Sequence, residues 1–108
     1  MRFHMDNRRR FERIPYSTDL VIDVDGTQIS AVSENISRGG MLLIIPREIE
    51  FGASVTLRFR LPKIPDEISV RSTVRWVKPG EDGKYGIGVQ FEELRPIEVW
   101  ALNDLLKS

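Results

Sequence analysis

The 108-residue sequence contains no cysteine and only one histidine, and these two absences exclude much chemistry. Without cysteine there is no disulfide, no thiolate metal ligand and no thiol nucleophile. A histidine-based triad or a zinc site with several imidazole ligands would have to rely on His4 alone. We therefore expect a protein that is not an enzyme, that has no metal site and that needs no cofactor.

Long apolar runs and an excess of charge of one sign are also missing. No segment approaches the length of a membrane-spanning helix, and the first seven residues lack the apolar region of a signal peptide. Sixteen basic and sixteen acidic residues give a formal net charge of zero, which argues against a broad nucleic-acid surface. We expect a cytoplasmic, single-domain protein without membrane insertion or DNA binding.

What the sequence does contain is a repeated alternation of apolar and polar residues, which predicts β-strands. The strands are expected at residues 16–24, 27–34, 41–45, 54–61, 68–76 and 85–91. Asp25-Gly26 is typical of the tight turn of a hairpin. About six antiparallel strands of this spacing predict an all-β barrel or sandwich.

The period changes after the last strand. From Pro96 to residue 107, Ile97, Ala101 and Leu105 recur at helical spacing, which predicts a C-terminal helix. Trp100 lies outside this apolar face of the helix, so one interpretation is that it contacts another copy of the chain. The oligomeric state expected from this pattern is a monomer or a weak dimer.

Positive charge gathers near the N-terminus. Residues 8–13 read Arg-Arg-Arg-Phe-Glu-Arg, and a guanidinium suits phosphate oxygens and the edge of guanine. Because Pro15 disfavours helix in the residue before it, this stretch is expected to be extended or looped. Residues 1–7 are predicted to be a flexible arm and residues 8–108 one domain. A solvated cluster, or unselective RNA binding, is the competing interpretation of the arginines.

A second stretch, Asn35-Ile36-Ser37-Arg38-Gly39-Gly40, has the composition of a turn. The two glycines favour backbone angles with positive φ, and an ordinary loop between strands is the competing interpretation.

Together the two stretches resemble the motifs of the PilZ domain family, whose members are receptors for cyclic di-GMP. Arg8, Arg9 and Arg13 fit an Arg-Arg-x-x-x-Arg motif, and 35–40 fits an Asp/Asn-x-Ser-x-x-Gly motif. Residues 85–91 also resemble the last strand of the family. The resemblance implies a six-stranded antiparallel β-barrel with a C-terminal α-helix, the first motif on a flexible segment that wraps the ligand and the second on the barrel surface.

The resemblance also implies the residues of a site. The expected contacts to cyclic di-GMP are Arg8, Arg9, Arg13, Asn35, Ser37 and Gly40, with Arg10, Arg38, Gly39 and Trp76 as secondary candidates. The family often has Asp where this chain has Asn35, so a weaker or differently arranged contact is expected there. Strand alternation points Trp76 into the core, which competes with a place at the site.

The function expected from the resemblance is that of a stand-alone cyclic di-GMP receptor or adaptor. Ligand binding would order the N-terminal arm and create a surface for an unidentified downstream protein. Two alternatives stay open: a degenerate PilZ scaffold that binds protein without nucleotide, and a small RNA-binding barrel. One ligand molecule or a stacked pair is compatible with the motifs.

Overall fold

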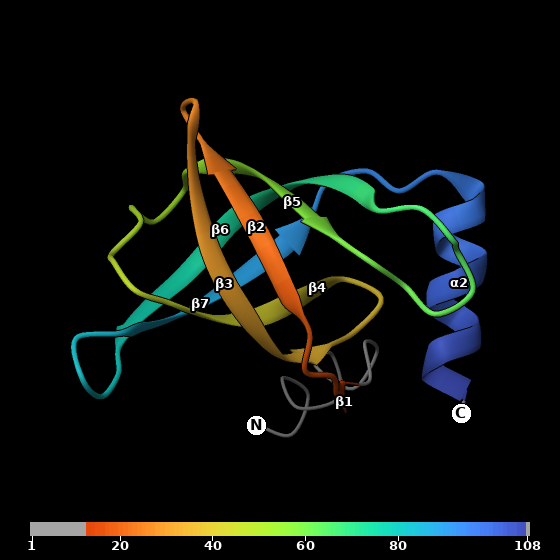
Figure 1. Cartoon of the computed structure of the whole chain (residues 1–108), viewed down its shortest axis with the longest axis horizontal. Coiled ribbons are helices and arrows are strands. Elements are labelled where there is room, and N and C mark those ends of the chain that lie inside the picture. The colour runs from red at the N-terminus through yellow and green to blue at the C-terminus, as the bar shows by residue number, and fades with distance from the viewer. Residues whose placement is uncertain (1–12, 108) are drawn as a thin grey trace, which may run out of the picture.

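The computed structural model describes residues 13–107, in which strands are followed by one helix. The elements are β1 (Ile14–Pro15), β2 (Asp19–Val24), β3 (Thr27–Ile36), β4 (Gly40–Ile45), β5 (Ser54–Phe59), β6 (Ile68–Pro79), β7 (Tyr85–Phe91) and α2 (Pro96–Lys107). In Figure 1 the strands cross around a common interior and α2 stands at one end of them.

Six of the strands close on themselves. They are hydrogen-bonded in the order β3-β2-β5-β6-β7-β4, and β4 pairs back onto β3. Every pairing is antiparallel, and the short β1 adds to the end of β3 as an extra strand. Closure leaves the six main strands without a free edge that could pair with another chain. The predicted six-stranded antiparallel barrel with a C-terminal helix is confirmed.

The alternation in the sequence fills the barrel interior. Ile22 on β2 and Leu57 on β5 face each other in the register and are both fully buried. The hairpin between β2 and β3 turns at Asp25 and Gly26, with φ of 48° and 82°. Positive φ at both positions is the geometry that favours Asp-Gly in two-residue hairpins, so this turn follows directly from the sequence.

Helix α2 is fixed at its N-terminus by a buried carboxylate. Glu98 accepts the backbone N–H of Arg95 at 2.9 Å and forms an ion pair with the Arg95 guanidinium at 2.7 Å, as in a capping box. Ala101 and Leu102 join the barrel core. Ile97 is 52% exposed, so its predicted place on the apolar face is wrong, whereas Trp100 is exposed as its spacing indicated.

Two strands are longer than predicted. β3 continues through Asn35 to Ile36, because Ile36 pairs with Met41 on one side and Ile14 on the other. The turn is therefore shorter than 35–40. β6 continues past Trp76 to Pro79. In the part of the chain that the structure describes, no helix has the length and apolarity to cross a membrane.

Candidate ligand-binding site

The turn between β3 and β4 is built by a buried serine. The Ser37 hydroxyl oxygen accepts the backbone N–H groups of Gly39 and Gly40 at 3.1 and 3.2 Å, and the Ser37 N–H donates to the Gly40 carbonyl at 2.9 Å. The Ser37 side chain is almost completely buried. This hydroxyl therefore holds the shape of the turn, and any ligand would meet a preformed loop.

The turn is also pressed against β7. Phe91 donates its N–H to the Gly39 carbonyl at 2.8 Å. A Cβ on Gly40 would lie 1.9 Å from the Val89 carbonyl oxygen, so only glycine fits there. Gly40 therefore serves a close approach of two backbone segments. The expected positive φ is wrong, because among residues 13–107 the glycines with positive φ are Gly26, Gly52 and Gly83.

The end of the first motif meets the start of the second. Arg13 Nη1 donates to Asn35 Oδ1 at 3.2 Å across 22 residues of sequence. The pairing of Pro15 with Asn35 in the β1–β3 ladder brings these two segments side by side. A register shift between Ser33 and Asn35 leaves the Asn35 side chain half-buried rather than on the inner face. Arg8, Arg9 and Arg10 lie outside the described residues.

Trp76 lies on the outside of the barrel, so its predicted core position is wrong. A second register shift falls between Val74 and Trp76, with Arg75 as the extra residue. The extra residue reverses the alternation that follows it, which turns Trp76 outward, 38% exposed, and Val77 inward.

Two glycines of β7 provide the surface on which the indole rests. A Cβ on Gly88 would lie 2.3 Å from Trp76 Nε1, and a Cβ on Gly86 would lie 3.8 Å from Cζ3. The ring therefore approaches the backbone at Gly88 more closely than any side chain there would permit. At 38% exposure, Trp76 keeps surface on which a flat ligand group can stack.

These groups border one cavity of about 560 Å³, which we call the arginine-lined cavity. Its lining comprises Arg13, Ser37, Arg38, Gly39, Gly40, Arg75, Trp76, Gly88, Val89, Gln90 and Phe91. Of the predicted residues that the structure describes, it contains all except Asn35. That residue lines an adjoining cavity of about 700 Å³, which shares Arg13.

Sequence reasoning missed Arg75, Gly88 and Gln90. Gly86 and Gly88 stood in the predicted strand 85–91 without an assigned role, whereas in the structure they support an indole from the neighbouring strand. Gln90 stands opposite Gly40 in the β4–β7 ladder and is exposed. Its place could have been found by aligning β7 with the turn, once the strand pairing was known.

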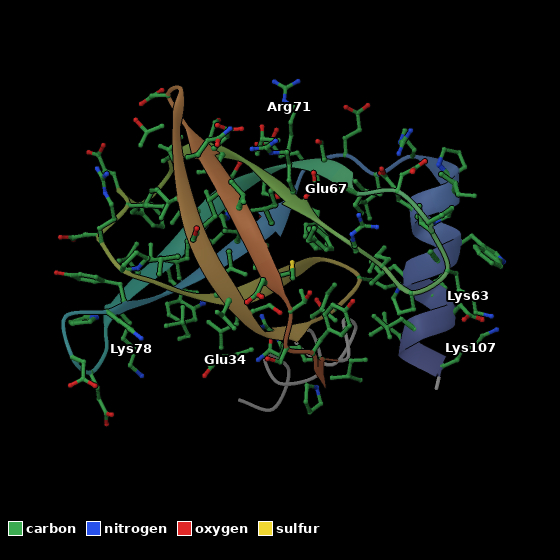
Figure 2. The ribbon with its side chains drawn as sticks, viewed as in Figure 1. Glu34, Lys63, Glu67, Arg71, Lys78 and Lys107 are labelled. Atoms are coloured by element: carbon green, nitrogen blue, oxygen red, sulfur yellow. The ribbon has the colours of Figure 1, made fainter. Side chains whose placement is uncertain are left out.

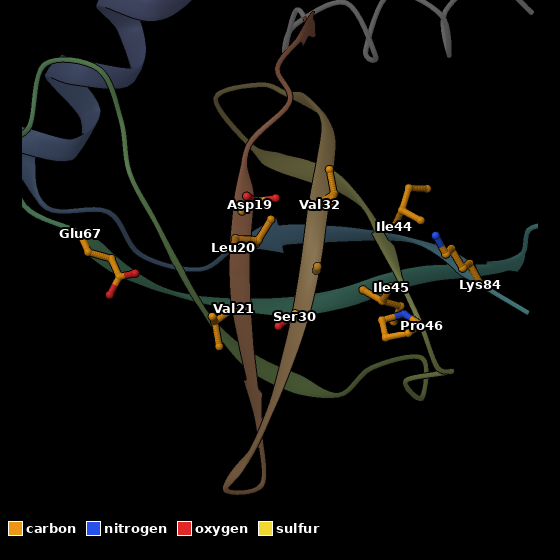
Figure 3. Close-up of a pocket in the computed structure, with 11 residues that line it drawn as sticks. Asp19, Leu20, Val21, Ser30, Val32, Ile44, Ile45, Pro46, Glu67 and Lys84 are labelled. Atoms are coloured by element: carbon orange, nitrogen blue, oxygen red, sulfur yellow. The ribbon is translucent and has the colours of Figure 1, made fainter.

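A third cavity of about 550 Å³ lies over β2, β3 and β4, and its lining has a different chemistry (Figure 3). Its charged lining residues are Asp19, Glu67 and Lys84, and it contains no arginine. None of the predicted site residues borders it. Among the cavities described, the arginine-lined one is therefore the candidate site for an anion.

The fold and the site define a small closed β-barrel with an arginine-lined surface cavity. The sequence pattern of the PilZ domain matches residues 7–108, and the chain belongs to this family. No curated protein matches the chain.

Solved structures share the fold. The inhibitor of motility MotI/DgrA of Bacillus subtilis has a TM-score of 0.76 and 24% identity, covering 93% of this chain and 50% of MotI. PlzA of Borreliella burgdorferi, in complex with c-di-GMP, has a TM-score of 0.67 and 15% identity, covering 95% and 43%. The K. pneumonia MrkH–c-di-GMP complex has a TM-score of 0.65 and 19% identity, covering 93% and 51%. The chain thus spans about half the length of these proteins.

Proposed function

We propose that this PilZ domain is a receptor that binds cyclic di-GMP in the arginine-lined cavity. One observation carries the proposal: Arg13 of the first motif and Ser37–Gly40 of the second border the same cavity. Family membership supports it, as does the fold shared with PlzA and MrkH, which were solved with this ligand. The volume of about 560 Å³ is within the range of roughly 300–1,000 Å³ that small-molecule sites occupy.

The chemistry of the lining suits a guanine dinucleotide. Arg13 and Arg38 offer planar forks of donors to phosphate oxygens or to guanine O6 and N7. The exposed face of Trp76 offers a base a surface for stacking. Arg8 and Arg9, which precede the described residues, are proposed to add further contacts to the phosphates, with Arg10 as a spare donor.

The proposed output is a change at the N-terminus rather than catalysis. Contacts from the first motif would order the residues before Arg13 over the ligand, and the new surface would be read by a partner protein in the cytoplasm. Hydrogen exchange of residues 5–15 with and without cyclic di-GMP tests this step. Slower exchange with ligand is the expected result, and equal exchange would remove the ordering step from the proposal.

The experiment that tests binding is calorimetric titration of cyclic di-GMP into the wild type and into an Arg9→Ala, Arg13→Ala double variant. Tight wild-type binding that falls by a factor of at least about 100 in the variant is expected, because two charge-assisted contacts are lost. An Arg47→Ala, Arg71→Ala variant is the matched control. It removes the same charge from exposed positions outside the cavity and should bind like the wild type.

GTP and a short RNA are the ligand controls. Binding of the RNA that weakens steeply with salt would indicate a nucleic-acid barrel instead. A folded wild type that binds no cyclic di-GMP would contradict the proposal and favour a protein-interaction scaffold.

A further inference from the structure

Arg75 occupies the extra position of the irregularity in β6. Val74 pairs with Val89 and Trp76 pairs with Gly88, so Arg75 has no residue opposite it in β7. Arg75 and Trp76 are both exposed, and both line the arginine-lined cavity. In a regular strand two consecutive side chains point to opposite faces. The bulge is therefore what brings a guanidinium and an indole together on one face.

Among residues 13–107, no acidic side chain lines the arginine-lined cavity. Its charged lining residues among 13–107 are Arg13, Arg38 and Arg75, with no carboxylate. Some guanidinium groups elsewhere on the barrel have partners: Arg58 lies 3.7 Å from Asp23, and Arg60 donates to the Pro65 carbonyl at 2.7 Å. Within the part of the chain that the structure describes, Arg75 has no such ion pair or hydrogen bond. None of residues 13–107 therefore occupies its donors.

The position of the indole restricts what Arg75 can reach. Because the ring is pressed onto the backbone at Gly88, a base can stack on its outer face only. The edges of that base then project sideways, parallel to the sheet surface. The long side chain of the neighbouring residue in the strand can reach such an edge in the plane of the base.

We infer that Arg75 is a specificity-determining contact outside both motifs, which donates to O6 and N7 of a guanine stacked on Trp76. This rests on the proposed function of the cavity. Guanine presents two acceptors on this edge, which match the fork of a guanidinium. Adenine presents a donor in place of O6, which arginine cannot accept because it has no acceptor of its own. Arg75 thus favours guanine over adenine dinucleotides.

The test is a double-mutant cycle in which one change is made in the protein, at Arg75, and the other in the ligand, at guanine N7. Cyclic di-GMP and its 7-deazaguanine analogue, which lacks the N7 acceptor, are each titrated into the wild type and into Arg75→Ala. In the wild type the analogue should bind about tenfold more weakly, because one bidentate contact is broken. In Arg75→Ala that penalty should shrink to about twofold or less, since the partner of N7 is already absent.

Two further variants separate the fork from the charge. Arg75→Lys keeps the charge without the planar fork, so its penalty should lie between those of the wild type and the alanine variant, because an ammonium can still donate to N7. Arg71→Ala removes an arginine from the same strand that projects away from the barrel at its rim (Figure 2), and it should keep the wild-type penalty. Arg75 is exposed, and unchanged circular dichroism verifies that each variant is folded.

The outcomes separate the two proposals. If the wild type binds cyclic di-GMP but the analogue penalty is the same with and without Arg75, guanine reading by Arg75 is wrong. If Arg75→Ala weakens both ligands equally, Arg75 contacts a phosphate instead, and the specificity inference fails while the receptor stands. If the wild type does not bind cyclic di-GMP, the receptor proposal fails and the inference fails with it.

Discussion

The barrel has a regular side and an irregular side, and they differ in what their side chains do. Between β2 and β5 the register runs without interruption, and apolar residues such as Ile22 and Leu57 alternate inward. The ladders β3–β4 and β6–β7 each contain one register shift. The first shift precedes Asn35 and the second precedes Trp76, and both side chains belong to or adjoin the candidate site.

This difference shows how a small barrel separates stability from binding. An uninterrupted ladder places every second side chain in the core, so it contributes buried apolar area. It cannot bring two consecutive side chains to the same outer face, where they could bind a ligand together. A bulge costs one ladder pairing and turns the side chains that follow it onto the other face. Substitutions on the regular side should therefore change stability, and those on the irregular side should change binding.

The largest effect is expected at Leu57, on the regular side. Leu57→Ala should lower the free energy of unfolding by about 2–5 kcal/mol, because the side chain is completely buried and leaves a cavity. Urea denaturation measures this loss. At a temperature where the variant is still folded, its affinity for cyclic di-GMP should stay within about twofold of the wild type. A larger loss of affinity than this would show that the two sides are not separable.

The next effect is expected at Gly88, on the irregular side. Gly88→Ala should push the indole off β7, since the new Cβ would lie 2.3 Å from Trp76 Nε1. Affinity for cyclic di-GMP should fall about tenfold, the size of one lost base–aromatic stack. Stability should change little, because the ring is exposed and can move into solvent.

The matched control for Gly88→Ala is Gly86→Ala, whose Cβ would make an ordinary contact of 3.8 Å with the same ring. Fluorescence in a Trp100→Phe background reports on Trp76 alone. Emission should shift in Gly88→Ala and not in Gly86→Ala. Equal spectra and affinities for the two variants would argue against the indole as a binding surface.

The regular side was predictable because alternation encodes it. The strands, the Asp25-Gly26 turn and the helix from Pro96 all follow from patterns that span several residues. The meeting of the two motifs was predictable only from the family resemblance, because nothing in their spacing of 22 residues requires Arg13 to reach Asn35. The roles of Arg8 and Arg9 stay predictions, since they lie outside the described residues.

The irregular side could not be predicted from the sequence, and the reason is physical. A bulge inserts one residue without any required amino acid, so the run from Val74 to Val77 reads as a regular strand with Trp76 inward. The sequence also does not show which group of a neighbouring strand approaches a glycine, because this depends on how the strands pair. Gly40 is needed for contact with the Val89 carbonyl and Gly88 for contact with an indole, and neither depends on backbone angle.

A smaller effect is expected at Asn35, where the first bulge meets Arg13. Asn35→Asp should replace the amide oxygen that accepts from the Arg13 guanidinium by a carboxylate oxygen, which turns the hydrogen bond into an ion pair and holds Arg13 more firmly. Affinity for cyclic di-GMP should rise about two- to fivefold, in line with the modest value of exposed ion pairs. Titration calorimetry measures this change, with Asn35→Ala as the control that should bind more weakly. Weaker binding by Asn35→Asp would mean that the added negative charge repels the ligand more than it positions Arg13.

An effect of similar size is expected at Tyr16, which connects the two sides. Its hydroxyl donates to the Arg60 carbonyl at 2.9 Å, just beyond β5, while its N–H donates to Glu34 in β3 at 3.1 Å. Burial raises the pKa of Tyr16 above its ordinary value of 10.0. The folded state therefore favours the neutral phenol. This contribution to stability is complete below the pKa of the unfolded chain and is lost as pH rises from about 10 through the higher folded pKa.

At neutral pH, Tyr16→Phe should be less stable by about 1 kcal/mol, the size of one hydrogen bond. Urea midpoints from pH 8 to pH 11 should show the difference between wild type and variant shrinking above about pH 10. If the difference in urea midpoint stays constant across that range, the hydrogen bond from the Tyr16 hydroxyl to the Arg60 carbonyl is not the source of the stabilisation.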